Sequence, residues 1–67
     1  MENWQNYIVI NPEIRSGKPT IIDTRITVSD VLYYLASGMT LPEILEDFPQ
    51  LTNEKILAAL SFATHQN

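Results

Sequence analysis

One helix-start pattern occurs three times between Thr24 and Leu60, and this repetition constrains the fold more than any other feature. A threonine hydroxyl accepts hydrogen bonds from the first turn of a helix, and an apolar pair five residues apart closes over the cap. The pattern predicts helices that begin after Thr27, Thr40 and Thr52. The apolar pairs that flank these caps are Ile26 with Val31, Met39 with Ile44, and Leu51 with Ile56.

The first two predicted helices also have capping boxes and stop signals. Asp30 and Glu43 each stand three residues after the capping threonine, where their carboxylates reach back to the backbone of the cap. Gly38 supplies a left-handed stop for the first helix. Pro49 ends the second helix, because the residue before a proline avoids the helical conformation.

Apolar residues at helical spacing predict which face of each helix is buried. Tyr33 and Tyr34 lie on the flanks of the first apolar face, where one is expected to cover the strands and the other to be exposed. The residues predicted to face inward in the first helix are Val28, Val31, Leu32, Leu35, Ala36 and Met39; in the second, Leu41, Ile44, Leu45 and Phe48; in the third, Ile56, Ala59, Leu60 and Ala63, with Leu57 and Phe62 beside them.

The residues before the helices predict a short β arm. Tyr7 to Ile10 and Thr20 to Ile22 are rich in β-forming residues, and a turn at Asp23-Thr24 follows the second run. Residues 1–6 carry no periodic signal and are candidates for fraying. Two strands this short cannot bury a face by themselves, so we expect them to lie against the helices or to pair with another chain.

These elements predict one mainly α domain over residues 1–67: a three-helix helix-turn-helix domain with a short N-terminal β-strand or hairpin element. Residues 7–27 form the arm and residues 28–67 the three helices. A chain of 67 residues without cysteine has a small core and no disulfide to support it. We therefore expect it to dimerise with itself or to dock on a partner.

Composition argues against several kinds of chemistry. The chain has no cysteine, and its single histidine, His65, is third from the end, so we expect no thiolate or histidine-rich metal site. Gly17-Lys18 lacks the remaining residues of a phosphate-binding loop. No nucleophile is paired with a base, so we expect neither an enzyme nor a cofactor. Glu43, Glu46 and Asp47 suit a solvated helix face better than a weak cation site.

The N-terminus is polar, and no apolar run approaches the roughly 18 residues that a bilayer requires. We therefore expect a cytoplasmic protein without a membrane role.

The second and third helices have helix-turn-helix proportions, which raises DNA binding as one hypothesis. In such a unit the start of the last helix enters the major groove, and the arm adds phosphate contacts. The net charge of −4 and the single base in the last helix favour the alternative, a protein-interaction or structural module without a DNA role. The candidate DNA contacts are Gln50, Thr52, Asn53 and Lys55, with Arg15, Lys18 and Arg25.

Two further interpretations concern the arm and the aromatic residues. Arg25 is expected to donate from its guanidinium to loop carbonyls, because five fixed donors hold a turn well. An exposed N-terminal edge strand suits pairing with a second chain, and aromatic residues are common in such contacts. Trp4 is expected to fold over the edge of the core, with a subunit contact as the alternative. The candidate contacts with a partner are Trp4, Tyr7, Ile8, Val9, Tyr33 and Tyr34.

A set of short motifs extends from about Ile8 to Ala63. They are Asn11-Pro12, Gly17-Lys18-Pro19, Thr24-Arg25-Ile26 with Val28, Gly38-Met39, Ile44-Leu45, Phe48-Pro49, Leu51-Thr52 and Ile56-Ala58-Ala59-Leu60. Taken together, these motifs resemble the family registered as domain of unknown function 433. The chain departs from that family at Asp23, where the family usually has glycine, and at Arg15-Ser16, where it often has Cys-Gly.

The resemblance implies a homeodomain-like helix-turn-helix domain, in a family whose members are often treated as antitoxins of the VapB type. Some members are encoded beside a PIN-like ribonuclease toxin, which they are thought to neutralise. The resemblance therefore implies an antitoxin-like, DNA-binding protein that pairs with such a toxin and regulates its own operon.

Overall fold

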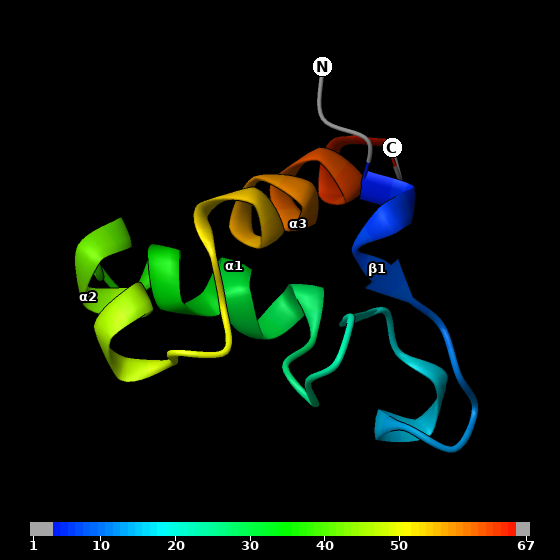
Figure 1. Ribbon diagram of the computed structural model, residues 1–67. Helices are drawn as coiled ribbons and strands as arrows, with labels where there is room; N and C mark the ends of the chain where they lie inside the picture. The colour runs from blue at the N-terminus through cyan, green and yellow to red at the C-terminus, as the bar shows by residue number, and fades with distance from the viewer. Residues whose placement is uncertain (1–3, 66–67) are drawn as a thin grey trace.

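The computed structural model describes residues 4–65, in which two short strands precede three helices (Figure 1). The fold is mainly α, as predicted, and the two strands form one antiparallel hairpin. The elements are η1 (Trp4–Asn6), β1 (Ile8–Val9), η2 (Arg15–Gly17), β2 (Thr20–Ile21), α1 (Val28–Ala36), α2 (Leu41–Asp47) and α3 (Asn53–His65).

The three predicted caps are present. Thr27 Oγ1 accepts from Asp30 N at 2.9 Å, and Asp30 Oδ2 accepts from Thr27 N at 3.0 Å, which completes a capping box. Thr40 and Glu43 form the second box. Thr52 Oγ1 accepts from Lys55 N at 3.2 Å at the start of α3. Three independent local signals therefore set where the helices begin.

Gly38 ends the first helical segment in the predicted left-handed conformation, with φ at 101°. Its N–H donates to Leu35 O at 3.1 Å, and Met39 N donates to Tyr34 O at 3.1 Å. This pair of bonds satisfies carbonyls that the end of a helix leaves free, and it turns the chain towards α2.

The hairpin is held to the start of α1 by its backbone. β1 pairs with β2 in the register Ile8 to Ile21 and Val9 to Thr20. On the other side of β2, Ile21 N donates to Ile26 O at 2.8 Å and Thr20 forms a bridge with Thr27. Thr27 is therefore both a helix cap and a neighbour of the sheet, and it is 2% exposed.

The core lies where α3 crosses α1 and the hairpin closes one end (Figure 1). α2 sits at the C-terminal end of α1, and residues 48–52 lead from it back to α3. The residues of the buried cluster are Ile21, Ile26, Val28, Val31, Ile44, Leu51, Ile56, Ala59 and Phe62. In the described part of the chain, none of the helices combines the length and apolar character needed to cross a membrane.

The arm differs from the prediction in detail. The strands are shorter than Tyr7–Ile10 and Thr20–Ile22, because turns occupy Tyr7 before β1 and Ile22 after β2, and Ile10 lies beyond the paired residues. Trp4–Asn6 is a 3-10 turn rather than a frayed end, because the Trp4 ring packs edge-on against Phe62 at 4.8 Å between ring centroids. Residues 1–3, for which fraying was also expected, lie outside the described residues.

The predicted inward faces of all three helices were partly wrong. On α2, Leu41 is exposed at the first residue of the helix. On α1, Leu32 and Ala36 are exposed, because the buried side of the helix turns towards Tyr34, which stacks on Phe48. On α3, Leu57 is exposed while Ala58 is buried, because α3 contacts α1 on one side and η1 and β1 on another.

Gly38 offers a direct test of this architecture. A Cβ at Gly38 meets nothing within 4 Å, so only backbone conformation opposes a side chain there. We expect Gly38→Ala to lower the free energy of unfolding by about 1–2 kcal/mol, as measured by urea denaturation. Gly38→Asn is the control, because asparagine tolerates positive φ better. An unchanged free energy in Gly38→Ala would contradict this account of the turn.

Candidate interaction surfaces

The four candidate DNA-reading residues lie together at the start of α3. Gln50, Thr52 and Asn53 are exposed, whereas Lys55 is half-buried. The Lys55 ammonium donates to Gln50 O at 3.0 Å, so the single base of this region is already engaged. Glu54 is exposed on the same first turn. The region offers polar groups, but little positive charge for phosphate.

The three arginine and lysine residues of the arm have different environments. Lys18 and Arg25 are exposed, whereas Arg15 is half-buried. Arg15 Nη1 donates to Arg25 O at 2.8 Å and forms an ion pair with Asp30 Oδ2 at 3.1 Å. The arginine that holds the turn is therefore Arg15, and the role expected for Arg25 was wrong: Arg25 supplies the carbonyl. The reason is backbone geometry, since Arg15 and Ser16 both have positive φ and direct the chain back towards α1.

Asp30 joins Arg15 of the arm to Thr27 at the start of α1, and we call these three residues the Asp30 junction. Burial would raise the pKa of its carboxyl group, but hydrogen bonds from the backbone and hydroxyl of Thr27, together with the Arg15 guanidinium, outweigh burial and lower the pKa from its ordinary value. The carboxylate therefore connects the cap of α1 to the loop of the arm. Sequence reasoning found the bond to Thr27 and missed the one to Arg15, for which no local signal exists.

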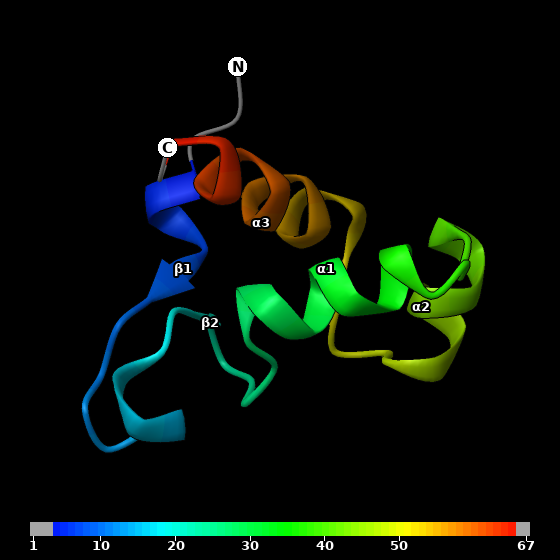
Figure 2. The ribbon, with the colours of Figure 1, turned by 180° about the vertical axis from the view of Figure 1, so that it is seen from behind.

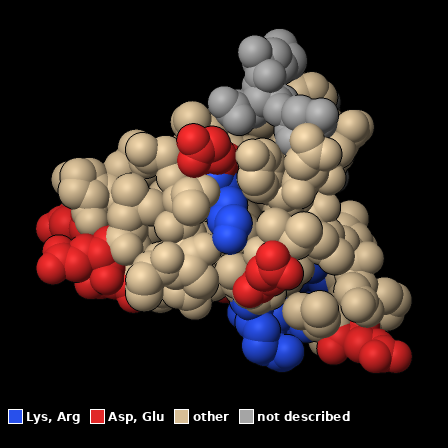
Figure 3. All heavy atoms as spheres, in the orientation of Figure 1, with Lys and Arg blue, Asp and Glu red and all other residues tan. Residues whose placement is uncertain are grey.

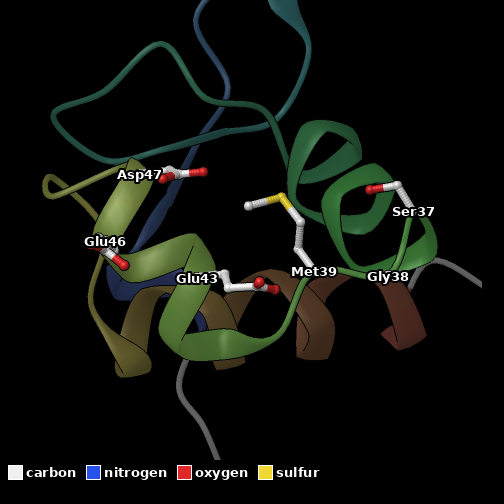
Figure 4. A pocket seen from close by; sticks show the side chains of 6 residues that line it. All are labelled: Ser37, Gly38, Met39, Glu43, Glu46 and Asp47. Atoms are coloured by element: carbon white, nitrogen blue, oxygen red, sulfur yellow. The ribbon is translucent and has the colours of Figure 1, made fainter.

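Acidic side chains gather at α2, at one end of the molecule (Figure 3). A surface hollow of about 540 Å³ lies between the end of α1 and α2. Figure 4 shows Glu43 and Asp47 directed towards this hollow, with Met39 between them and Ser37 across from them. We call the surface formed by Ser37, Gly38, Met39, Glu43, Glu46 and Asp47 the acidic hollow.

The carboxylates of the acidic hollow are not equivalent. Glu43 Oε1 accepts from Thr40 N at 2.8 Å and so belongs to the cap. Glu46 and Asp47 are exposed and make no hydrogen bond or ion pair with another described side chain. Residues 4–65 contain no group of three or more His, Cys, Asp or Glu side chains placed to hold a metal ion. The arrangement suits a basic side chain of a partner.

The aromatic candidates lie in three separate places. Tyr34 stacks on Phe48 at 4.6 Å between ring centroids, so it covers the end of α2. The expectation that one of the two tyrosines covers the strands was therefore wrong. Burial raises the pKa of the Tyr34 phenol, as does the charge of Asp30, while Arg15 opposes the change. Tyr33 is 70% exposed. Trp4 packs on α3, while Tyr7, Ile8 and Val9 are half-buried in and beside β1.

Ile10 is an exposed residue that sequence reasoning placed in a strand without assigning it to a surface. Its side chain is 62% exposed, directly after β1. The sequence did indicate this exposure, because Ile10 is the last residue of the predicted strand and Asn11-Pro12 ends the strand directly after it.

Comparison with known proteins finds one matching family and similar proteins. The family described as "Protein of unknown function (DUF433)" matches residues 8–63. The uncharacterized protein y4eO of Sinorhizobium fredii (strain NBRC 101917 / NGR234) is 36% identical over 56 residues, which are 84% of this chain and 25% of that protein.

A solved structure also resembles this chain. The crystal structure of a DUF433 member protein from Anabaena variabilis ATCC 29413 aligns with a TM-score of 0.86 and 34% identity. The alignment covers 91% of this chain and 60% of that one. The chain therefore spans a quarter of one relative and three-fifths of the other.

The Asp30 junction gives a pH-dependent prediction. Because folding lowers the pKa of Asp30, its contribution to stability is present above about pH 3.8 and is lost as pH falls through the folded-state pKa. We expect Asp30→Asn to reduce the free energy of unfolding by roughly 1 kcal/mol at pH 7 and to flatten its decline in acid. The measurement is urea unfolding from pH 2 to 7, with Asp23→Asn as the exposed control. Identical pH profiles for Asp30→Asn and the native chain would contradict this role.

Proposed function

The chain belongs to the DUF433 family, and from the surfaces of this member we propose a non-catalytic, antitoxin-like protein that binds a basic protein partner through the acidic hollow. The observation that supports this proposal is the distribution of charge. Residues 38–67 contain four acids (Glu43, Glu46, Asp47 and Glu54) against one base, Lys55, which gives −3 with His65 neutral. That base is also engaged by Gln50 O.

The proposed partner is a PIN-like ribonuclease, the class that the family resemblance implies. A ribonuclease needs positive charge where it holds the phosphates of RNA. An acidic surface attracts such a protein and competes with its substrate, which is a physical route to neutralisation. Glu46 and Asp47 are the residues that we assign to this contact, because Glu43 is already used as a cap.

DNA reading by a helix-turn-helix unit is the second candidate function. It is favoured by one observation: Thr52 and Asn53 are exposed at the first turn of α3, after a linker of helix-turn-helix length. An asparagine side chain forms a bidentate pair with adenine in the major groove. In this proposal the dimer would place two α3 helices on two half-sites and autoregulate the operon.

The partner proposal predicts a charge-dependent complex. We expect a tagged chain to co-purify from its native host with a small basic protein that mass spectrometry identifies as PIN-like. Replacing Glu46 by Gln and Asp47 by Asn together should lower recovery at least tenfold at moderate salt, because two carboxylates are lost without a change of shape. Glu54→Gln is the matched control, since it removes a carboxylate from α3. Equal recovery of both variants, or co-purification with no protein, would contradict the proposal.

The DNA proposal predicts a separate result. In a gel shift with the operon's own upstream DNA, we expect binding only at low salt, because few bases are available for phosphate. Asn53→Ala should reduce the preference over a scrambled duplex about tenfold, which corresponds to the roughly 1–3 kcal/mol of one base contact. Absence of binding even at low salt would remove DNA reading from the account.

A further inference from the structure

β1 has one edge that no other described segment covers. β2 lies on its inner side, whereas the outer edge faces away from the hairpin (Figure 2). β2, by contrast, has neighbours on both sides, because Ile21 N donates to Ile26 O and Val28 N donates to Pro19 O. The sheet therefore has one satisfied edge and one open edge.

The hydrogen-bond pattern identifies the backbone groups of the open edge. In an antiparallel pair, successive residues alternate between facing the partner strand and facing away from it. Ile22 N donates to Tyr7 O at 2.8 Å, so this pair is hydrogen-bonded across the hairpin. Ile21, the register partner of Ile8, directs its N–H away from β1, to Ile26 O. By this alternation Ile8 and Ile10 direct their N–H and C=O groups to the open edge.

The same edge is apolar and uncharged. No charged residue stands between Asn6 and Pro12. The side chain of Ile8 packs against the core, and Ile10, two residues on, lies on the same face of the strand. Ile10 is 62% exposed, since the hairpin extends past the helices at this point. An exposed isoleucine beside free backbone groups is an arrangement that favours strand pairing.

From this geometry we infer that two copies of the chain pair antiparallel along β1 and join their hairpins into one four-stranded sheet. The register places Ile8 opposite Ile10 of the second copy and Val9 opposite its own counterpart. Each Ile8–Ile10 pair then exchanges two backbone hydrogen bonds, and a twofold axis passes between the two Val9 residues.

Three features favour a second copy as the occupant of this edge. First, the antiparallel register is self-complementary, because the outward N–H and C=O groups of Ile8 meet those of Ile10 in the second copy. Second, Ile10 would lie beside Ile8 of the second copy and continue its core. Third, residues 13–25 contain Arg15, Lys18 and Arg25 against Glu13 and Asp23, which gives +1, whereas residues 38–67 give −3. Contact through the arms therefore keeps the acidic helices of the two copies apart.

A hollow beside the strand extends the proposed contact. Val9, Ile14 and Ile22 are among the residues that line a cavity of about 400 Å³ in the arm. Val9 lies on the opposite face of β1 from Ile8 and Ile10. Pairing through Val9 would therefore bring the two hollows next to each other at the twofold axis, and both faces of the new sheet would gain apolar contacts.

The test is the oligomeric state of the native chain and of variants of Ile10, measured by analytical ultracentrifugation over a range of concentrations. We expect a dimer of the native chain. Ile10→Pro removes an outward N–H without touching the β1–β2 ladder, and Ile10→Glu places a charge on the edge. Both should weaken dimerisation at least tenfold. Ile10→Val is the matched control and should remain dimeric, and circular dichroism checks that each variant stays helical.

A second measurement keeps the test independent of how the variants fold. In the native chain, the amides of Ile8 and Ile10 should exchange with deuterium more slowly as protein concentration rises, while the exposed Tyr33 side of α1 should not change. A native chain that stays monomeric at every concentration would overturn the inference. So would a dimer that persists in Ile10→Pro and Ile10→Glu but dissociates in Tyr33→Glu, because the contact would then involve α1.

Discussion

The junction of Thr27, Asp30 and Arg15 is the interaction on which the rest of the structure depends. Thr27 caps α1 and forms a bridge with Thr20, so the first helix and the sheet share one residue. Asp30 closes the cap and accepts from Arg15, whose guanidinium also holds Arg25 O. In a chain of 67 residues with a small core, this link fixes the hairpin relative to the helices. The open edge of β1 is positioned through it.

The parts of the fold that sequence predicted correctly are those decided by neighbours in the chain. The capping boxes at Thr27 and Thr40, the left-handed Gly38 and the turn at Asp23 each depend on residues within a few positions. The errors concern contacts between distant segments. Arg15 and Asp30 are fifteen positions apart, and nothing in the local sequence shows that one arginine rather than another holds the turn.

The same distinction explains the buried faces. Helical spacing gives the period of an apolar face but does not give its exact direction, which the neighbouring elements decide. Tyr34 turns inward because Phe48, at the end of α2, offers a stacking partner. Ala58 is buried and Leu57 exposed, in a helix that contacts α1 as well as η1 and β1. The candidate DNA contacts at the start of α3 are neighbours in the sequence, but the hydrogen bond from the Lys55 ammonium to Gln50 O required the structure.

We propose a separate surface for each partner: the β1 edge for a second copy, the acidic hollow for a basic protein, and the start of α3 for DNA. The proposed contact with a basic protein is best tested by hydrogen–deuterium exchange of the complex isolated from the native host, compared with the chain alone. Binding of the basic partner should slow exchange over residues 37–47 and leave residues 50–57 unchanged. Slower exchange at residues 50–57 with no change around the acidic hollow would contradict it.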